Sequence, residues 1–359
     1  MIVAFVVAHG LPRDTVDGLL RLMGALFGFN GNVLPKSKYL LRKLWSPQLS
    51  RHVKHHYYCG NMLDPVHGMV QVNCALCREN SRVSVLKDNG CFFSIMNVKE
   101  QLYQLISTCK EALYNELKKI EMLQCTDQIR DITSGRLYKN LRRTGSITGQ
   151  DLTITINTDR SPVYKSSRTS VWPIQFVVNE LPPKLRHQHP VLGGLWFGHA
   201  HPNMTVFMDK FIEELNAVGT VVWKFCSESV KSNVHAICCT VDAPARAAVG
   251  NHTQFNGKFG CPWCLTSGTQ VAGARRYLET TGAARTSAGM LKDMDRALDW
   301  NVTVNGLKGP SPLVNLKHFD LVCSQAGEYM HCVLLGVARQ LTEFWLGSSN
   351  SHEPFYIGM

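Results

Sequence analysis

The order of strand-like and helix-like segments between residues 151 and 249 constrains the fold more than any other feature of this sequence. Each segment has either an alternating or buried-strand pattern or a helical spacing of apolar residues. In order, they are strands at 151–159, 170–179 and 191–197, a helix at 204–218, a strand at 234–241 and a helix at 243–249. This order predicts an α/β domain with an RNase H-like mixed sheet and flanking helices.

Two aspartates end the first and fourth of these strands. Asp159 and Asp242 are far apart in the sequence, but in an RNase H-like sheet the two strands are neighbours. Adjacent carboxylates repel each other unless a cation lies between them, and two Mg²⁺ or Mn²⁺ ions about 3.5–4 Å apart would activate a phosphodiester. We therefore predict that the carboxylates lie within about 7 Å of each other. The structural alternative makes Asp242 a helix N-cap and Asp159 a turn residue.

Composition places the chain among globular proteins with a polyanionic partner. Of its 359 residues, 45% are hydrophobic and 18% charged, and the net charge is +11. Such a charge favours nucleic acid or an acidic membrane surface. No apolar run approaches the roughly 20 residues that span a bilayer, and the start lacks the pattern of a signal peptide. Thirteen cysteines with two CxxC pairs favour metal sites in a reducing compartment, the cytosol or the nucleus.

The first 97 residues suggest a helical segment and then a basic, cysteine-rich region. Residues 1–35 have helical apolar spacing after Asp14 and Asp17. Residues 36–58 combine cations with Trp45, Tyr57 and Tyr58, which suits a phosphate backbone and exposed bases, although a solvated basic face has the same composition. The candidate nucleic-acid-binding cations are Lys36, Lys38, Arg42, Lys43, Arg51 and Lys54.

A zinc site is predicted in residues 36–97. Cys74 and Cys77 form one CxxC pair, and Cys59 lies upstream, but Met62 occupies the position where Cys59 would need a partner. Methionine is a poor zinc ligand. The residues that could complete a tetrahedral set are His55, His56, His67 and Cys91. Residues 98–148 then read as a helical linker with a strongly periodic helix at 98–120, and residues 149–359 as the RNase H-like domain.

A second CxxC pair follows Asp242. Cys261 and Cys264 flank Pro-Trp, and His318 and His331 lie downstream. Two cysteines and two histidines make a full structural zinc set. The alternatives are a thioredoxin-like redox pair, which needs a preceding strand and a helix start, and plain core cysteines.

Several strings in order resemble the transposase domain of CACTA-type (En/Spm) DNA transposons of the animal lineage. The strings are TINTDR at 155–160, SSRTSVWPIQFVVNELPPKLR at 166–186, LWFG at 195–198, DAPAR at 242–246, QFNGKFGCPWC at 254–264, KGPSPL at 308–313 and YMHCVLLGV at 329–337. HYYC and CALC resemble that family's cysteine-rich segment, so the resemblance covers about residues 55–359. It implies an RNase H-like fold, a DDE/D acid triad with a divalent metal, Mg²⁺ or Mn²⁺, and double-stranded transposon ends as substrate. Of the two compartments, we therefore expect the nucleus. It places Asp159 and Asp242 at the first two acids.

The third acid is the main departure from the family pattern. Arg160 stands where related chains have Gly, and Glu328 where they usually have Asp. Family members continue beyond the position of Met359, so we expect this chain to be truncated and inactive. Glu328 and Glu343 are the available substitutes. The run Val333, Leu334, Val337, Leu341 and Phe344 predicts a buried helix face that turns Glu343 to solvent, and Glu328 suits a helix start. We therefore expect that neither glutamate completes the acid triad.

The sequence thus leaves two main functions open. The first is a transposon-derived DDE/D transposase with double-stranded DNA as its partner, no membrane partner and a possible homo-oligomeric state. The second is a domesticated or decayed protein that binds DNA or protein without cutting. A zinc hydrolase fits less well, because no HExxH motif is present and a CxxC–His set leaves no open zinc position. We expect DNA binding with a steep salt dependence and no cleavage.

Overall fold

The computed structural model describes residues 13–27, 37, 40, 52–59, 71–74, 77–123, 128–162, 170–198, 201–278 and 282–358. The chain divides into two units, Met1–Lys54 and His55–Met359. In the first unit, α2 (Arg13–Phe27) is the predicted N-terminal helix, and it buries Val16 and Leu20.

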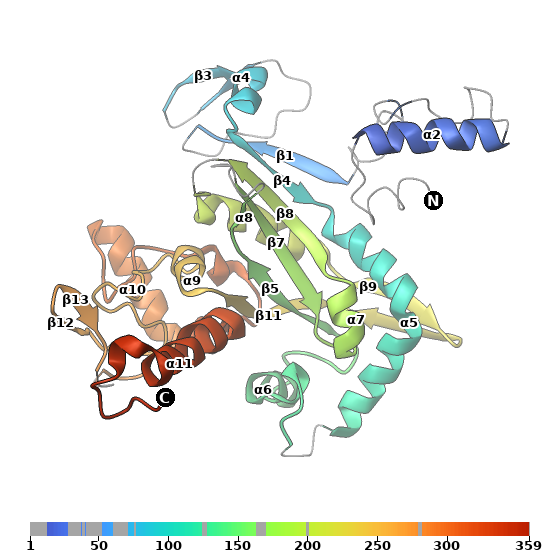
Figure 1. The fold of residues 1–359 in the computed structure, drawn as a ribbon. Helices are drawn as coiled ribbons and strands as arrows, with labels where there is room; N and C mark the ends of the chain where they lie inside the picture. The colour runs from blue at the N-terminus through green and yellow to red at the C-terminus, as the bar shows by residue number, and fades with distance from the viewer. Residues whose placement is uncertain are drawn as a thin grey trace. The chain divides into compact units, whose positions relative to one another are not determined.

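A mixed sheet with eight described strands organises the second unit (Figure 1). Its order is β1 (Val53–Tyr57), β4 (Phe92–Met96), β8 (Val191–Gly198), β7 (Ser170–Val178), β5 (Leu152–Thr158), β11 (Val234–Val241) and β14 (Gln325–Gly327), with β6 (Ser161–Pro162) on β7. Strands β4, β8, β7 and β5 pair antiparallel, whereas β5, β11 and β14 pair parallel. The predicted α/β class and the adjacency of β5 and β11 are confirmed.

The core forms where two helices pack on this sheet. Helix α5 (Val98–Leu123) contacts β8 and β9, and α8 (Met204–Asn216) contacts β4 and β8. The apolar residues that recur at helical spacing along α5 are all buried, as the periodicity predicts: Leu102, Leu105, Ile106, Leu113, Leu117 and Ile120. Packing is close enough that a Cβ at Gly193 would lie 2.3 Å from Phe211 Cε2. The sheet–helix contact at this point therefore requires glycine.

The cysteine-rich region joins this sheet instead of forming a separate body. Strands β1 and β4 extend the sheet beyond β8, so the predicted boundaries at residues 97 and 148 fall inside one unit. The remaining elements are short helices and hairpins and the helices of the last third. They are β2 (Gln71–Asn73), β3 (Asn80–Arg82), α4 (Val83–Asp88), α6 (Arg136–Arg143), α7 (Pro183–Gln188), β9 (Val221–Phe225), β10 (Glu228–Ser232), α9 (Ala243–Val249), β12 (Thr269–Val271), β13 (Ala274–Arg276), α10 (Ser287–Trp300), η3 (Met330–Ala338), α11 (Arg339–Leu346) and the 3₁₀ turns η1 (Ile132–Ser134), η2 (Pro312–Asn315) and η4 (Ser348–Asn350).

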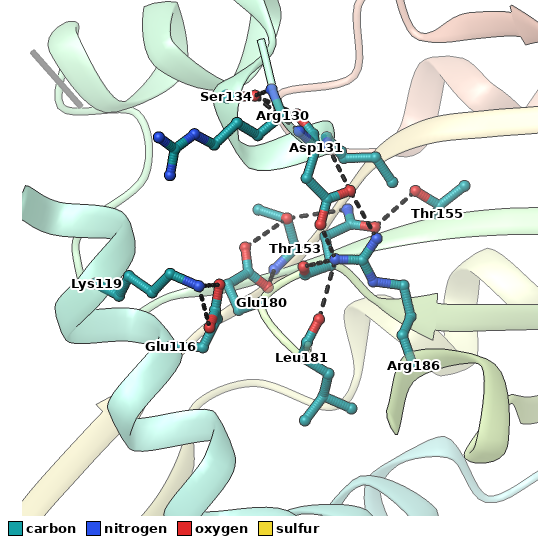
Figure 2. Close-up of polar contacts among 12 residues, drawn as sticks. Glu116, Lys119, Arg130, Asp131, Ser134, Thr153, Thr155, Glu180, Leu181 and Arg186 are labelled. Atoms are coloured by element: carbon teal, nitrogen blue, oxygen red, sulfur yellow. Dashed lines mark hydrogen bonds and ion pairs between the residues drawn. The ribbon is translucent and has the colours of Figure 1, made fainter. Parts of the chain in front are cut away.

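A buried polar network ties α7 and the η1 loop to β5 (Figure 2). The fully buried carboxylate of Glu180 accepts hydrogen bonds from Thr153 N (2.8 Å) and Thr153 Oγ1 (2.6 Å). Nearby, the buried Arg186 forms a bidentate pair with Asp131 at 2.9 and 2.6 Å. Burial favours the neutral form of Asp131, but the hydrogen bonds from Arg186 and from the Ile132 amide outweigh it and lower its pKa. The network satisfies most of these buried polar groups, which would otherwise be costly to bury; Arg186 Nε has no hydrogen-bond partner among the described residues.

None of the helices among the described residues is both long enough and apolar enough to cross a membrane.

Candidate metal centre and carboxylate edge

Three cysteine sulfurs gather in the N-terminal part of the second unit. Cys59, Cys74 and Cys77 hold their Sγ atoms within 4.8 Å of one another, and Cys59 Sγ lies 3.5 Å from Cys77 Sγ. Sulfurs that share one tetrahedral zinc, at about 2.3 Å each, lie about this far apart. Among the described residues, this is the only group of three or more His, Cys, Asp or Glu side chains gathered so closely. The group could bind a metal such as zinc.

Local backbone structure explains how the CxxC pair turns both sulfurs inward. The hairpin of β2 and β3 leads into and out of the turn, Arg78 adopts a left-handed φ of 59°, and its amide donates to the Cys74 carbonyl at 2.9 Å. The Cys77 amide donates to Cys74 Sγ at 3.4 Å. An amide aimed at a sulfur favours the thiolate, which is the form that binds metal.

The structure also narrows the choice of fourth ligand. His55 Nδ1 lies 2.9 Å from Ser94 Oγ, and the His56 ring stacks on Phe93, so neither joins the cysteine group. Cys91 packs against the same small hydrophobic cluster as Cys59, and its carbonyl accepts from the Tyr58 amide. Met62 and His67 lie outside the described residues. Cys91 is not part of the gathered group either, whereas Glu79 Oε2 lies 4.0 Å from Cys77 Sγ. Among the described residues, Glu79 and Cys91 are therefore the candidates for the fourth ligand.

Three acids follow three neighbouring parallel strands in the same register. Ile156 of β5 pairs with Cys239 of β11, and Cys239 pairs with Gln325 of β14. Three residues after these paired positions come Asp159, Asp242 and Glu328. Parallel strands in register end at one edge of the sheet, so the three backbones lie side by side there. We call this row the carboxylate edge.

The side chains at the carboxylate edge also cap the segments that follow. Asp242 Oδ1 accepts from the Ala245 amide at 2.8 Å, so the N-cap reading of Asp242 is confirmed. Glu328 accepts from the amides of Met330 and His331 and from His331 Nδ1, each at 2.7 Å. Burial favours the protonated form of Glu328, but these hydrogen bonds together outweigh it and lower its pKa.

Capping leaves the carboxylates able to bind metal but not yet gathered around one point. A carboxylate oxygen has two lone pairs, so an oxygen that accepts one amide can take another partner. This leaves room at Asp242 Oδ1 and Glu328 Oε1, whereas Glu328 Oε2 already has two partners. The ligand atoms of the three acids do not form a group within 4.8 Å. Their carboxylate separations therefore stay a prediction. Asp159 Oδ1 accepts from the amide of Arg160 at 2.6 Å, and the Arg160 side chain is exposed.

The prediction for the last helices is correct for Glu343 and wrong for the buried face. Glu343 is exposed and pairs with Arg339. The expected buried residues, however, are all 39–56% exposed: Val333, Leu334, Val337, Leu341 and Phe344. No described element covers this side of η3 and α11, so their apolar periodicity does not mark a core contact. Glu343 is therefore exposed for a different reason than the one predicted, because the apolar residues around it on α11 are exposed too.

The second CxxC pair is not joined by its predicted histidines. His318 lies beside His235, with ring centroids 5.2 Å apart, and His235 lies 3.9 Å from Asp151 at the start of β5. Trp263, between the two cysteines, instead contacts Gln325 of β14. His331 is hydrogen-bonded to Glu328. The structure therefore does not assemble Cys261, Cys264, His318 and His331 into one site.

The predicted nucleic-acid-binding region is described only in part. Lys36, Lys38, Arg42, Lys43, Arg51 and Trp45 lie outside the described residues, whereas Lys54 is exposed on β1. The two tyrosines are not free to stack on bases. Tyr57 is buried, and Tyr58 stacks on Trp196 with centroids 4.5 Å apart. Their aromatic pattern reflects the sheet core.

Sequence reasoning missed Arg246 and His252, two buried polar residues beside the carboxylate edge. DAPAR places Arg246 one helical turn after Asp242, which was the available signal.

Comparison of the sequence with models of known protein families gave no match, and comparison with curated proteins gave none either.

Proposed function

We propose that this chain is a transposon-derived DDE/D-type domain that acts on DNA by metal-dependent phosphoryl transfer in the nucleus. The single observation that carries the proposal is the in-register row of Asp159, Asp242 and Glu328 after three adjacent parallel strands. The strand order β8, β7, β5, β11, β14, in which β7 alone runs antiparallel to β5, supports an RNase H-like assignment for this part of the sheet.

The donor set at the carboxylate edge suits hard divalent cations. Three carboxylates offer only oxygen ligands, which Mg²⁺ and Mn²⁺ prefer over nitrogen or sulfur. Bound there, such ions would polarise a phosphodiester and lower the pKa of an attacking water. The expectation that Glu328 stands apart from the site rested on its helix-start position. Its register beside Asp242 now favours it as the third acid.

A basic groove at the other end of β5 supports DNA as the substrate. A cavity of about 1210 Å³ beside α6 is lined by Arg136, Lys139, Arg142 and Arg143, with Glu121 as its one acidic residue. Gly149, at the rim of this groove, lies shortly before β5 starts. Seven strand residues span roughly 23 Å, so a duplex of about seven base pairs would reach from the groove to the carboxylate edge.

The test is metal-dependent nicking of supercoiled plasmid DNA by the intact chain. The sequence alone predicts no cleavage, but the register of Glu328 beside Asp242 leads us to expect slow nicking in Mn²⁺. Asp242→Asn should lose at least about 100-fold of this nicking, because removing one carboxylate weakens metal binding and transition-state stabilisation together. The matched control is Asp299→Asn, at an exposed position of α10, which should nick like the unmodified chain.

The capping contacts of Glu328 favour a second candidate, a DNA-binding protein that does not cut. Both of its carboxylate oxygens already accept backbone amides. In that case the chain would bind duplex DNA with an affinity that falls steeply with salt but leave the plasmid intact in Mg²⁺ and Mn²⁺. Absence of nicking alongside such binding would replace the first candidate with this one.

A further inference from the structure

A small cavity adjoins the carboxylate edge. It has a volume of about 230 Å³ and lies between α9 and the second CxxC turn. Its walls include Ala243, the residue that follows Asp242, and the aromatic rings of Phe255, Trp263 and Tyr277. This volume is below the roughly 300–1,000 Å³ of sites for drug-sized ligands, so it suits a single ring system.

Two buried polar atoms at this cavity have no hydrogen-bond partner within the described part of the chain. They are Arg246 Nη1 and His252 Nε2. Both residues line the cavity, and they are 8% and 6% exposed. Buried polar atoms are almost always paired, because an unpaired one costs about 1–3 kcal/mol. Two residues with such atoms line this one cavity, so a ligand that enters it could supply their missing partners.

The two atoms have opposite hydrogen-bonding character. The Arg246 guanidinium can only donate. His252 Nδ1 lies 2.7 Å from the Thr253 carbonyl, to which it donates, so Nε2 is left as an acceptor. Burial lowers the pKa of His252 to about 4, which keeps the ring neutral at pH 7. Such a ligand must therefore present both an acceptor and a donor.

The aromatic rings that line the cavity are fixed in place but partly exposed to solvent. The Trp263 indole donates to the Gln325 carbonyl at 3.1 Å, and the Arg246 guanidinium lies 4.9 Å above its ring. Trp263 is still 42% exposed and Phe255 57%. Exposed aromatic rings beside a cation are the usual platform for stacking bases of single-stranded nucleic acid.

We propose that this cavity receives one unpaired nucleobase of a single-stranded DNA segment. Every base has flat faces to stack on and offers acceptors and donors along its edge. A phosphate group fits less well, because it would satisfy Arg246 but repel the lone pair of His252. The choice of DNA rests on the proposed function. A Cβ at Gly327 would lie 3.9 Å from Arg246 Nη1, so the guanidinium reaches the strand end that carries Glu328.

The probe is a short single-stranded oligodeoxynucleotide with one central 2-aminopurine, titrated into the intact chain. Stacking on an aromatic ring should quench the 2-aminopurine fluorescence. Phe255→Ala and Trp263→Ala should each weaken binding about tenfold and abolish most of the quenching. Trp300→Ala is the matched control, since Trp300 is 63% exposed on α10 and is absent from the cavity lining. Phe255 is exposed enough that its variant should fold even if Trp263→Ala does not.

An oligonucleotide with an abasic site in place of 2-aminopurine separates base capture from backbone attraction, and it should bind about tenfold more weakly. Equal binding of the two oligonucleotides, no binding of either, or unchanged binding by both aromatic variants would overturn the proposal. The proposed function fails separately. Base capture without plasmid nicking would leave the cavity assignment standing, whereas nicking with no base preference would remove only the cavity assignment.

Discussion

Purified intact chain should contain about one zinc ion, and Cys74→Ser should reduce this content to near zero. Cys74 is buried in the three-sulfur group, and its Sγ also accepts a hydrogen bond from the Cys77 amide. Removing one of three clustered thiolates leaves too few ligands for a structural zinc. Because structural zinc stabilises the fold that binds it, the variant should also unfold at lower temperature. Elemental analysis and a thermal melt, each with and without a chelator, measure both effects.

Two cysteine variants serve as controls for the zinc result. Cys109→Ser changes another buried cysteine, on α5 and outside the group, and should keep its zinc. Cys264→Ser should keep it as well, because the second CxxC pair lacks further gathered ligands. Zinc lost from Cys264→Ser and retained in Cys74→Ser would reverse the assignment of the metal centre.

Glu180→Gln should stabilise the protein by up to about 3 kcal/mol at pH 8 and leave it nearly unchanged at pH 4. Burial raises the pKa of Glu180 from 4.5 to about 7. The unfolded chain therefore ionises first, so stability is highest below pH 4.5 and falls as the pH rises toward 7. A shift of this size corresponds to about 3 kcal/mol. Glutamine fills the same space and carries no charge to bury.

Chemical unfolding of the intact chain at pH 4, 5.5 and 8 checks this prediction. The matched variant is Glu213→Gln, whose side chain is 58% exposed on α8, and it should change the unfolding free energy by less than about 0.5 kcal/mol at each pH. If the unmodified chain and Glu180→Gln lose the same stability between pH 4 and 8, ionisation of Glu180 does not destabilise the folded protein and the prediction is wrong.

Local patterns predicted most of the central sheet and its helices. Residues 151–159 contain β5, as predicted. Their alternating pattern suggested one exposed face, but β5 is a central strand between β7 and β11 and is buried on both faces. The hairpin of β9 and β10 was missed because its turn uses Cys226 and Ser227 at φ of 45° and 67°. That geometry is normally signalled by Asn or Gly, and neither is present at these two positions.

The site was predictable where its residues are close in sequence. The CxxC spacing pointed to Cys74 and Cys77, and a nearby Cys59 completed the gathered group. The role of Glu328 depends instead on β14, a three-residue strand of Gln, Ala and Gly, which has no recognisable pattern. Its register with β11 comes from tertiary pairing alone. The position of His318 also depends on tertiary packing. The sequence alone therefore could not show that it lies beside His235, at the end of the sheet opposite the carboxylate edge.

The parallel pairing of β5, β11 and β14 has a consequence for how the carboxylate edge comes into being. Parallel neighbours need long crossover connections, and here each connection contains several other elements. Contacts between residues so distant in sequence slow folding, because chain entropy must be lost before they form. During synthesis, β14 is also the last of the described strands of this sheet to leave the ribosome. A nascent chain can therefore fold much of its core while the edge still lacks Glu328, so the row of carboxylates is completed only once β14 has paired with β11.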